Sequence, residues 1–312
     1  MLFQNIFNCK GGRIITNAKV TKIIIEEGKG AVGVKLDNGR EIGVKRLVAS
    51  STNPYTLLLK HIGAEHLDTR IVDSIRRIEW GDSVLAIYLA LDGPVEYYAG
   101  KEIIPSAQLH LSPQTLDFFA KIFYECRGGK LPSEPLAIMS NDSIADPSRT
   151  PSGKHLLKFL ILSVPYKITS NDGDIEGSGG YDNNNNTAND RNWNKIKGQY
   201  SDHIIEMISE KYAPNLKKIT LKSVVYSPID SETKWATSTQ GTLSCGALVP
   251  YQTASMRPIP ELAQYKIPQV PNVYLCGSGG HPGPGVSMAP GRNAAQAIFA
   301  DLNLDFKSIV DQ

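Results

Sequence analysis

Short apolar segments separated by turn residues fill positions 11–52, which is the pattern of small β-strands. The strands that we expect there lie at 13–16, 20–26, 33–36 and 42–50. Asn38-Gly39 supplies the positive φ that a tight hairpin needs, so residues 32–48 are predicted to form a β-meander. Ahead of it, residues 2–10 precede a glycine pair and predict one or two helical turns.

Helical and strand periods alternate through the rest of the chain. Helices are predicted at 54–62, 68–77, 112–126, 193–212 and 290–302. Strands are predicted at 80–91, 136–141, 155–164, 216–226 and 273–276. Residues 169–192 are rich in Asn, Asp, Gly and Ser, and their apolar content is too small to offset the entropy of ordering. We expect a flexible surface insertion there, without chemistry.

Charge and composition argue against several classes of protein, including nucleic-acid-binding, metal-binding and membrane-spanning proteins. The chain has 33 basic and 31 acidic residues and no basic run that would follow a phosphate backbone, so we expect no nucleic-acid partner. Its four cysteines are far apart and fit reduced thiols in a cytoplasmic compartment, and its six histidines lack the spacing of a metal site. The longest apolar runs reach about half of the ~20 residues that a membrane-spanning helix requires. The N-terminus also lacks the pattern of a signal peptide.

One glycine motif has the spacing of a dinucleotide-binding turn but the wrong structural context. Gly28, Gly30 and Gly33 match the G-x-G-x-x-G spacing of a dinucleotide-binding turn. That turn needs a helix at its last glycine, whereas residues 34–39 continue as a strand and a turn. We therefore interpret the motif as a hairpin turn, and we expect any first-domain dinucleotide cradle to lie outside this chain.

A second glycine-rich stretch has the context of a ligand loop. Glycines 277, 279, 280, 283 and 285 follow a short apolar strand and precede an alanine-rich helix. Glycines let the backbone approach a ligand closely, and the free amides of a helix start favour an anionic or electron-rich group. Ser287 is the predicted N-cap, and Pro290 suits the first turn. From these residues alone, a ligand loop and a turn that binds nothing remain equal alternatives.

A resemblance favours the ligand loop. The succession Cys276-Gly-Ser, His281-Pro-Gly-Pro-Gly-Val and Pro290-Gly-Arg-Asn-Ala-Ala resembles the closing motif of the phytoene dehydrogenase and carotenoid desaturase-like flavoproteins. Residues 11–20 with 31–39, 48–54, and 227–230 with 257–262 are similar to further segments of that family. Residues 80–226 have no distinctive match and resemble its variable substrate domain. The family's βαβ unit should lie before Gly11, so we expect this chain to be the C-terminal portion, without that unit.

The resemblance implies an α/β architecture. It is a partial FAD/NAD(P)-binding flavoprotein fold of the amine oxidase and phytoene desaturase type, with a mixed-sheet substrate domain. The expected organisation has a remnant of the FAD-binding domain at 1–53 and a substrate-binding domain at 54–226, with its flexible insertion at 169–192. Residues 227–312 then return to the FAD-binding domain.

The same resemblance implies FAD as the cofactor, held mainly by main-chain groups. The main chain of Val20 would bind near the adenosine end, and the Ala49-Ser50 step would lie near the same cofactor. Gly277 and Ser278 would approach the ribityl and phosphate region. The flavin ring would lie along Gly285, Val286, Ser287 and Met288, and Gly283 is a further cofactor-binding residue. His281, the one titratable side chain of the loop, is either a general base or a structural residue.

The implied activity is desaturation of an apolar isoprenoid or carotenoid-like substrate by hydride transfer to flavin. We expect it to need an N-terminal dinucleotide-binding segment or subunit, as part of a larger or split enzyme. One alternative is a non-catalytic remnant or an apolar-ligand-binding protein without flavin. Another is a different reaction on the same fold, such as saturation or isomerisation of a polyene or oxidation of an amine. We expect a cytoplasmic protein, and the sequence leaves peripheral contact with a membrane open.

Overall fold

The computed structural model describes residues 2–112, 115–169, 186–234 and 238–310. The chain consists of two compact units. Unit 1 combines Met1–Ile78 with Leu248–Gln312, and unit 2 is Glu79–Ala247.

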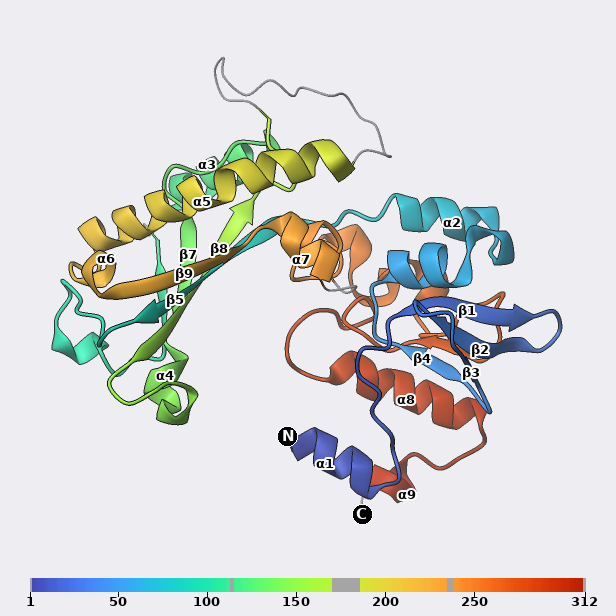
Figure 1. Cartoon of the computed structure of the whole chain (residues 1–312). Helices are drawn as coiled ribbons and strands as arrows, with labels where there is room; N and C mark the ends of the chain where they lie inside the picture. Colours follow the sequence, from blue (N-terminus) through green and yellow to red (C-terminus); the bar gives the residue numbers. More distant parts are fainter. Residues whose placement is uncertain (1, 113–114, 170–185, 235–237, 311–312) are drawn as a thin grey trace. The chain divides into compact units, whose positions relative to one another are not determined.

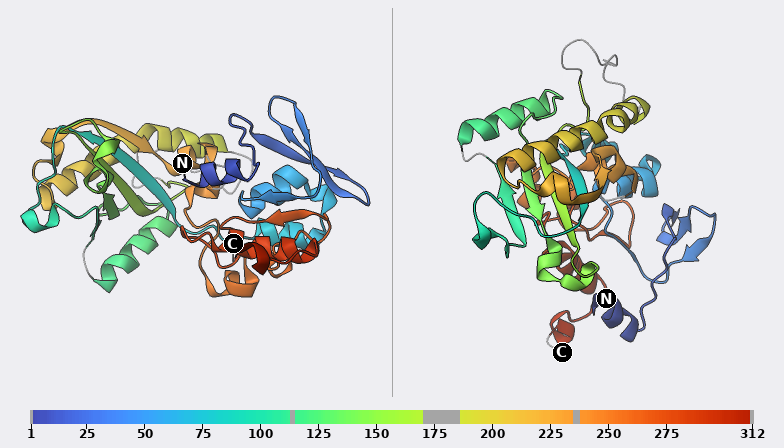
Figure 2. Two further views of the ribbon diagram at one scale, coloured as in Figure 1. Left: turned by 90° about the horizontal axis from the view of Figure 1, so that it is seen from below. Right: turned by 60° about the vertical axis from the view of Figure 1, so that its left-hand side comes forward.

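Unit 1 opens with the predicted meander. It follows helix α1 (Leu2–Cys9) and consists of β1 (Val20–Glu26), β2 (Gly30–Leu36) and β3 (Glu41–Gly43), paired antiparallel in that order. The β1–β2 hairpin is visible in both views of Figure 2. Gly28 and Gly30 have φ of 75° and 82° at its turn, which confirms the interpretation of this glycine motif as a hairpin.

Two strand predictions in this region are wrong. Residues 13–16 form no strand, and their Ile14 and Ile15 side chains are about half exposed, so no sheet face buries them. The predicted strand 42–50 divides at the exposed Lys45-Arg46 pair into β3 and β4 (Val48–Ser50). Strand β4 leaves the meander, which therefore ends at β3.

Strand β4 instead pairs in parallel with β10 (Val273–Leu275), and Ala49 faces Tyr274 in this register. All three residues of β10 are buried. The Asn272 side chain joins this pair to the meander, because it accepts from the Ala31 amide at 2.8 Å and donates to the Ala31 carbonyl at 2.9 Å. Helix α8 (Ala289–Asp301), which confirms the predicted C-terminal helix, runs beside the pair (Figure 1).

The other elements of unit 1 are short. The predicted helix 54–62 is a π-helix, η1 (Thr56–Ile62), which packs against β1 and has Leu57, Leu58 and Ile62 fully buried. Helix α2 (Thr69–Arg76) is capped by Asp68, whose side chain accepts from the Arg70 amide at 2.8 Å. The remaining elements are η2 (Ala64–His66), η6 (Pro250–Gln252), η7 (Ala254–Met256), η8 (Pro260–Leu262) and α9 (Lys307–Val310).

Unit 2 is built on a five-stranded sheet in the order β6-β7-β8-β5-β9. Every pair among these strands is antiparallel, so the parallel pairing of β4 with β10 belongs to unit 1 and the predicted mixed sheet is not found in unit 2. The strands are β5 (Ser83–Leu91), β6 (Gln108–Leu111), β7 (Leu136–Ser140), β8 (His155–Val164) and β9 (Thr220–Tyr226). The helices are η3 (Lys101–Ile103), α3 (Leu116–Arg127), α4 (Asp142–Ala145), η4 (Pro147–Arg149), α5 (Asn186–Lys211), α6 (Leu216–Ile219), α7 (Pro228–Lys234) and η5 (Thr239–Gly241).

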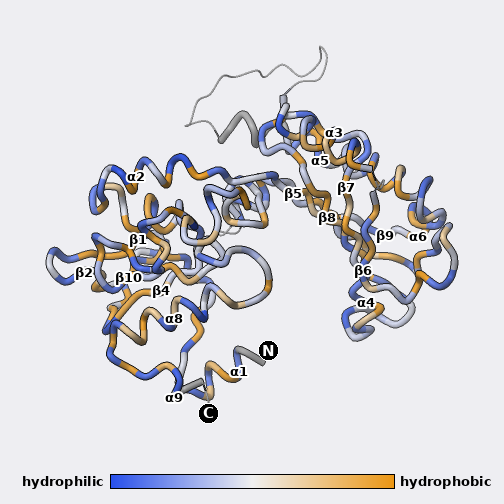
Figure 3. Tube along the Cα trace, turned by 180° about the vertical axis from the view of Figure 1, so that it is seen from behind, coloured by the Kyte–Doolittle hydropathy of each residue, from blue (hydrophilic) through white to orange (hydrophobic). Residues whose placement is uncertain are grey.

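The two faces of this sheet differ. Leu157, Phe159 and Ile161 of β8 are fully buried in the core with side chains of α5, whereas Lys158 and Leu160, on the opposite face, are only partly buried. Figure 1 shows α5 along the first face, and Figure 3 shows hydrophobic positions gathered on the central strands. Alternate residues of β8 are therefore buried under α5, whereas those on the opposite face remain partly exposed.

Three boundaries differ from the sequence prediction. The predicted strand 216–226 begins as α6, because Leu216 is buried in the core while Lys217 and Lys218 are exposed. Residues 54–78 lie in unit 1 through the contact of η1 with β1, and residues 227–247 lie in unit 2 through the packing of α7 and η5 on β5. Of the expected flexible insertion at 169–192, residues 170–185 lie outside the described residues. Residues 186–192 are helical and begin α5, so the insertion prediction is wrong there.

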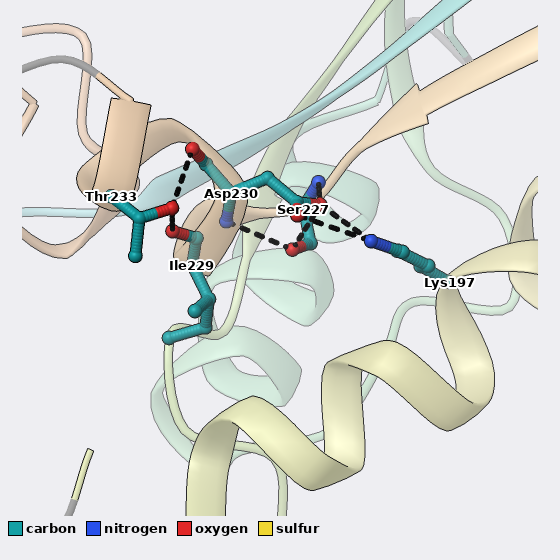
Figure 4. Close-up of polar contacts among 5 residues, drawn as sticks. All are labelled: Lys197, Ser227, Ile229, Asp230 and Thr233. Atoms are coloured by element: carbon teal, nitrogen blue, oxygen red, sulfur yellow. Dashed lines mark hydrogen bonds and ion pairs between the residues drawn. The ribbon is translucent and has the colours of Figure 1, made fainter. Parts of the chain in front are cut away.

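Helix α7 is fixed to α5 by a partly buried ion pair (Figure 4). Asp230 Oδ2 lies 2.8 Å from Lys197 Nζ and accepts from the Ser227 amide at 2.8 Å. In return, the Asp230 amide donates to Ser227 Oγ at 3.2 Å, which completes a capping box. Burial raises the pKa of Asp230, but the hydrogen bonds from Lys197 and Ser227 outweigh it and leave the pKa below its usual value.

Asp230→Asn should lower the free energy of unfolding by about 1–3 kcal/mol near pH 7, because Lys197 loses its charged partner. The folded pKa of Asp230 is lowered, so its contribution is present above the unfolded pKa and is lost as pH falls through the folded pKa. Urea denaturation should therefore show a smaller difference in the free energy of unfolding between wild type and Asp230→Asn at pH 3 than at pH 7. Glu206→Gln, which breaks the exposed pair with Lys217, is the control and should change little. A loss at Asp230 that is equal at both pH values would contradict this account.

Candidate cofactor site

The glycine-rich loop starts where β10 ends, against the segment that follows β4. The Cys276 amide donates to the Ser50 carbonyl at 2.8 Å. A Cβ atom on Gly277 would lie 2.4 Å from the Ser51 carbonyl oxygen, and one on Gly279 would lie 2.5 Å from Pro54 Cδ. Glycine is therefore required at both positions, because the two chain segments approach closer than any side chain allows. The Cys276 thiol itself is partly buried, and burial raises its pKa, which fits a packing role.

The buried side chain of Arg257 hydrogen-bonds to the loop. Its side chain is 1% exposed, and its Nη2 donates to the Ser278 carbonyl at 3.0 Å. Gly283 has φ of 113°, and a Cβ atom there would lie 3.1 Å from Arg257 Nε. The buried guanidinium therefore hydrogen-bonds the loop at the Ser278 carbonyl and leaves little space for a side chain at position 283.

Tyr265 holds the middle of the loop to α8. Its hydroxyl donates to the His281 carbonyl at 2.9 Å and accepts from Asn293 Nδ2 at 3.0 Å. The ring is 8% exposed, and a Cβ atom on Gly280 would lie 3.4 Å from it. The loop therefore has hydrogen bonds to β4, to Arg257 and to Tyr265, whose hydroxyl is bonded in turn to α8.

The start of α8 differs from the prediction. The residue before the helix is Met288, which has φ of 58°, and Ser287 is not the N-cap. Ser287 Oγ instead accepts from the Ala289 amide at 3.3 Å. Pro290 occupies the first turn as predicted, where its missing N–H is not needed.

The outer part of the loop presents apolar groups and open backbone. Val286 is fully exposed and Met288 is 58% exposed. Gly285 has φ of 115°, and no heavy atom lies within 4 Å of a Cβ built on it. Exposed apolar side chains beside open main chain and a helix start would suit a planar ring with an electron-rich edge. The residues present therefore fit FAD.

His281 lies in the same loop and is partly buried. Its Nδ1 atom is buried, with no hydrogen-bond partner among the described residues. Its carbonyl is held by Tyr265. The imidazole can therefore meet a ligand or solvent only through its other atoms.

The structure brings most of the predicted site residues together. Ala49 and Ser50 lie on β4 opposite Tyr274 and Leu275 of β10, next to Gly277 and Ser278. The other predicted loop residues follow in the same segment, namely His281, Gly283, Gly285, Val286, Ser287 and Met288. Val20 belongs to the other sheet of unit 1, at the start of β1 opposite Leu36.

Sequence reasoning missed Arg257 and Tyr265. Arg257 was part of a segment with family resemblance, but no role followed from it. A charged residue among prolines and apolar residues, 257–262, was the available signal, because an arginine in such a context is often buried against carbonyl groups. Tyr265 offered no comparable signal, since its contacts lie 16 and 28 positions away.

Within the described residues, no group of three or more His, Cys, Asp or Glu side chains could hold a metal ion. No helix in the described part of the chain has the length and apolar content needed to cross a membrane.

Tyr265→Phe should raise amide hydrogen exchange in residues 277–288 and lower the free energy of unfolding by about 1 kcal/mol, because the hydroxyl makes both contacts. Tyr274→Phe is the matched control, since its hydroxyl donates to Asp301 at 2.7 Å, away from the loop. Both rings are buried, at 8% and 6% exposure. Equal loop exchange in the two variants would show that Tyr265 does not hold the loop.

Similar proteins are known along almost the whole chain. A pyridine nucleotide-disulfide oxidoreductase domain-containing protein 2 from Mus musculus is 29% identical over 302 residues, which cover 94% of this chain and 48% of that protein. A phytoene desaturase from Fusarium fujikuroi is 24% identical over 93% of this chain and 47% of that protein. No family model matches the chain. The chain spans about half the length of the curated relatives that it matches.

A solved structure shares the fold. An oxidoreductase from Methanosarcina mazei superimposes with a TM-score of 0.52 at 17% identity, over 96% of this chain and 52% of that one. The predicted α/β flavoprotein-type fold is thereby confirmed. Together with the curated relatives, this supports a relationship to the FAD-type oxidoreductases in the broad sense.

Proposed function

We propose that this chain is part of an FAD-dependent oxidoreductase of the phytoene desaturase kind, which removes hydrogen from an apolar isoprenoid or carotenoid-like substrate. The observation that carries the proposal is the loop between β10 and α8, whose main chain is held by Ser50, Arg257 and Tyr265. Similarity to phytoene desaturases supports the reaction type. When bound, FAD would supply the acceptor for a hydride from a substrate carbon.

The chain's own residues would bind and orient the cofactor through the main chain. Gly277 and Ser278 would lie nearest the phosphate and ribityl groups, and Gly283 to Met288 would cover the ring. The dipole of α8 favours negative charge at this end of the loop. A dinucleotide-binding segment, supplied by the same polypeptide or by a second subunit, would hold the rest of FAD, with Val20 at the adenosine end.

His281 is the candidate for proton transfer where the reaction requires it. Its Nδ1 is buried, so a proton could be exchanged with a ligand only at Nε2. Hydride transfer itself needs no side-chain nucleophile.

The open face of the sheet in unit 2 would bind the apolar substrate. Ile138, Leu160 and Leu162 are partly buried on this face, opposite the one covered by α5. Partly exposed branched side chains offer an apolar ligand a surface that releases water on contact. None of the four cysteines is in a disulfide bond, which suits a reducing, cytoplasmic compartment. Peripheral contact with a membrane would give access to such a substrate.

The direct test is titration of FAD with the purified chain, followed by flavin fluorescence and by absorbance after gel filtration. The proposal predicts quenched fluorescence and a chain that retains the yellow colour. A chain that leaves FAD fluorescence unchanged at saturation would support the alternative, a non-catalytic remnant or apolar-ligand-binding protein without flavin.

Gly285→Ala should weaken FAD binding by about tenfold or more, because a methyl group would stand where the ligand approaches the main chain. Gly39→Ala is the matched control, since Gly39 also has positive φ and open space but lies in the β2–β3 turn. Both variants should lose about 1–2 kcal/mol of stability from the strained φ. Equal FAD affinity in the two variants, measured by calorimetry, would remove Gly285 from the cofactor site.

A further inference from the structure

A row of polar residues crosses the open apolar face of the unit 2 sheet. Gln108 of β6 pairs with Ser140 of β7, Ser140 pairs with Lys158 of β8, and Lys158 pairs with Tyr88 of β5. Directly paired side chains on one face of an antiparallel sheet lie about 5 Å apart. The four polar groups therefore line up across four neighbouring strands.

The middle of the neighbouring row on this face is apolar. Ile138 pairs with Leu160, and Leu160 pairs with Ala86. The same row ends in the exposed His110 on β6 and in Tyr226 on β9. In the next row, Leu136 pairs with Leu162. The four leucine and isoleucine side chains are partly buried and Ala86 is buried. An extended apolar surface thus begins immediately beside the polar row.

The Lys158 side chain has no hydrogen bond or ion pair to any residue that the structure describes. It is nevertheless partly buried, between Leu156 and Leu160 along its own face. Several other lysines of unit 2 have carboxylate partners, among them Lys154 with Asp92 and Lys211 with Glu134. An ammonium group beside apolar side chains is stabilised by an anion, and the polar row offers hydroxyl groups beside Lys158 but no carboxylate.

The ring of Tyr88 is held in place beside this lysine. It packs edge-on against Tyr226 of β9, with ring centroids 5.9 Å apart and an interplanar angle of 86°. Tyr226 pairs with Ala86, on the same face. The phenol next to Lys158 therefore belongs to a fixed part of the surface.

We propose that this face binds an amphipathic ligand, a long-chain carboxylic acid whose carboxylate is held by Lys158 and whose chain lies along Ile138, Leu160 and Leu162. Tyr88 and Ser140 would add hydroxyl donors to the carboxylate. The identification of this ligand as the substrate rests on the proposed function. It replaces a pure hydrocarbon by an apolar molecule with one acidic end, because a hydrocarbon would leave the Lys158 ammonium without an anionic partner.

The test compares a fluorescent polyene fatty acid with its methyl ester, titrated into the full chain without FAD. Wild type should bind the acid at least about tenfold more tightly than the ester, as expected for a charge-assisted hydrogen bond. Lys158→Met keeps the apolar stem and should abolish the difference, while Lys158→Arg should keep it. Lys222→Met is the matched control, because Lys222 lies on the same face of the edge strand β9, opposite Ala90, and its loss should not change the preference.

Three results would overturn the proposal: equal affinity of wild type for acid and ester, a preference that survives in Lys158→Met, or no binding of either ligand. Thermal denaturation checks that Lys158→Met is folded, and no loss is expected because the side chain has no partner among the described residues. The titration contains no flavin. A chain that prefers the acid and binds no FAD would therefore refute the proposed function alone, and one that binds FAD without this preference would refute the carboxylate site alone.

Discussion

The parallel pairing of β4 with β10 is the constraint on which the candidate site depends. It joins Val48 to Val273 and continues one step beyond the strand, through the hydrogen bond from the Cys276 amide to the Ser50 carbonyl. This step presses Gly277 against Ser51, so the glycine-rich loop leaves the sheet at a fixed point. The loop's position is therefore set by a contact between residues more than two hundred positions apart.

A loop with five glycines has much backbone entropy to lose, about 1–2 kcal/mol for each residue that is fixed. Each hydrogen bond that holds it contributes only about 1 kcal/mol net. This explains why the loop has several supports, from Arg257, from Tyr265 and from β4, and why two of them bind its carbonyl groups. In unit 2, by contrast, helix α5 packs on one face of the sheet, and the β8 residues on the other face are only partly buried.

Local pattern predicted the elements that depend on local chemistry. The Asn38-Gly39 turn, the hairpin at Gly28 to Gly33, the helix after Pro290 and the alternation along 155–164 all appear in the structure. The resemblance led to the loop residues from Gly277 to Met288, and the roles expected of them remain proposals. Contacts between residues distant in sequence could not be predicted from local pattern. The departure of β4 from the meander, the supports from Arg257 and Tyr265, and the helical turn at Leu216 each depend on partners distant in sequence. Ser287 is not the N-cap because Met288, in the left-handed backbone region, is the residue that directly precedes the helix.

The central claim is that the loop between β10 and α8 is the cofactor-binding part of this chain. Amide chemical shifts in ¹⁵N-labelled chain, followed during titration with FAD, test it residue by residue. The account predicts shifts concentrated at residues 277–289 and at the end of β4, with the hairpin turn at Gly28 to Gly30 unaffected. Shifts that gather at the hairpin or elsewhere, or a spectrum that FAD leaves unchanged, would contradict it.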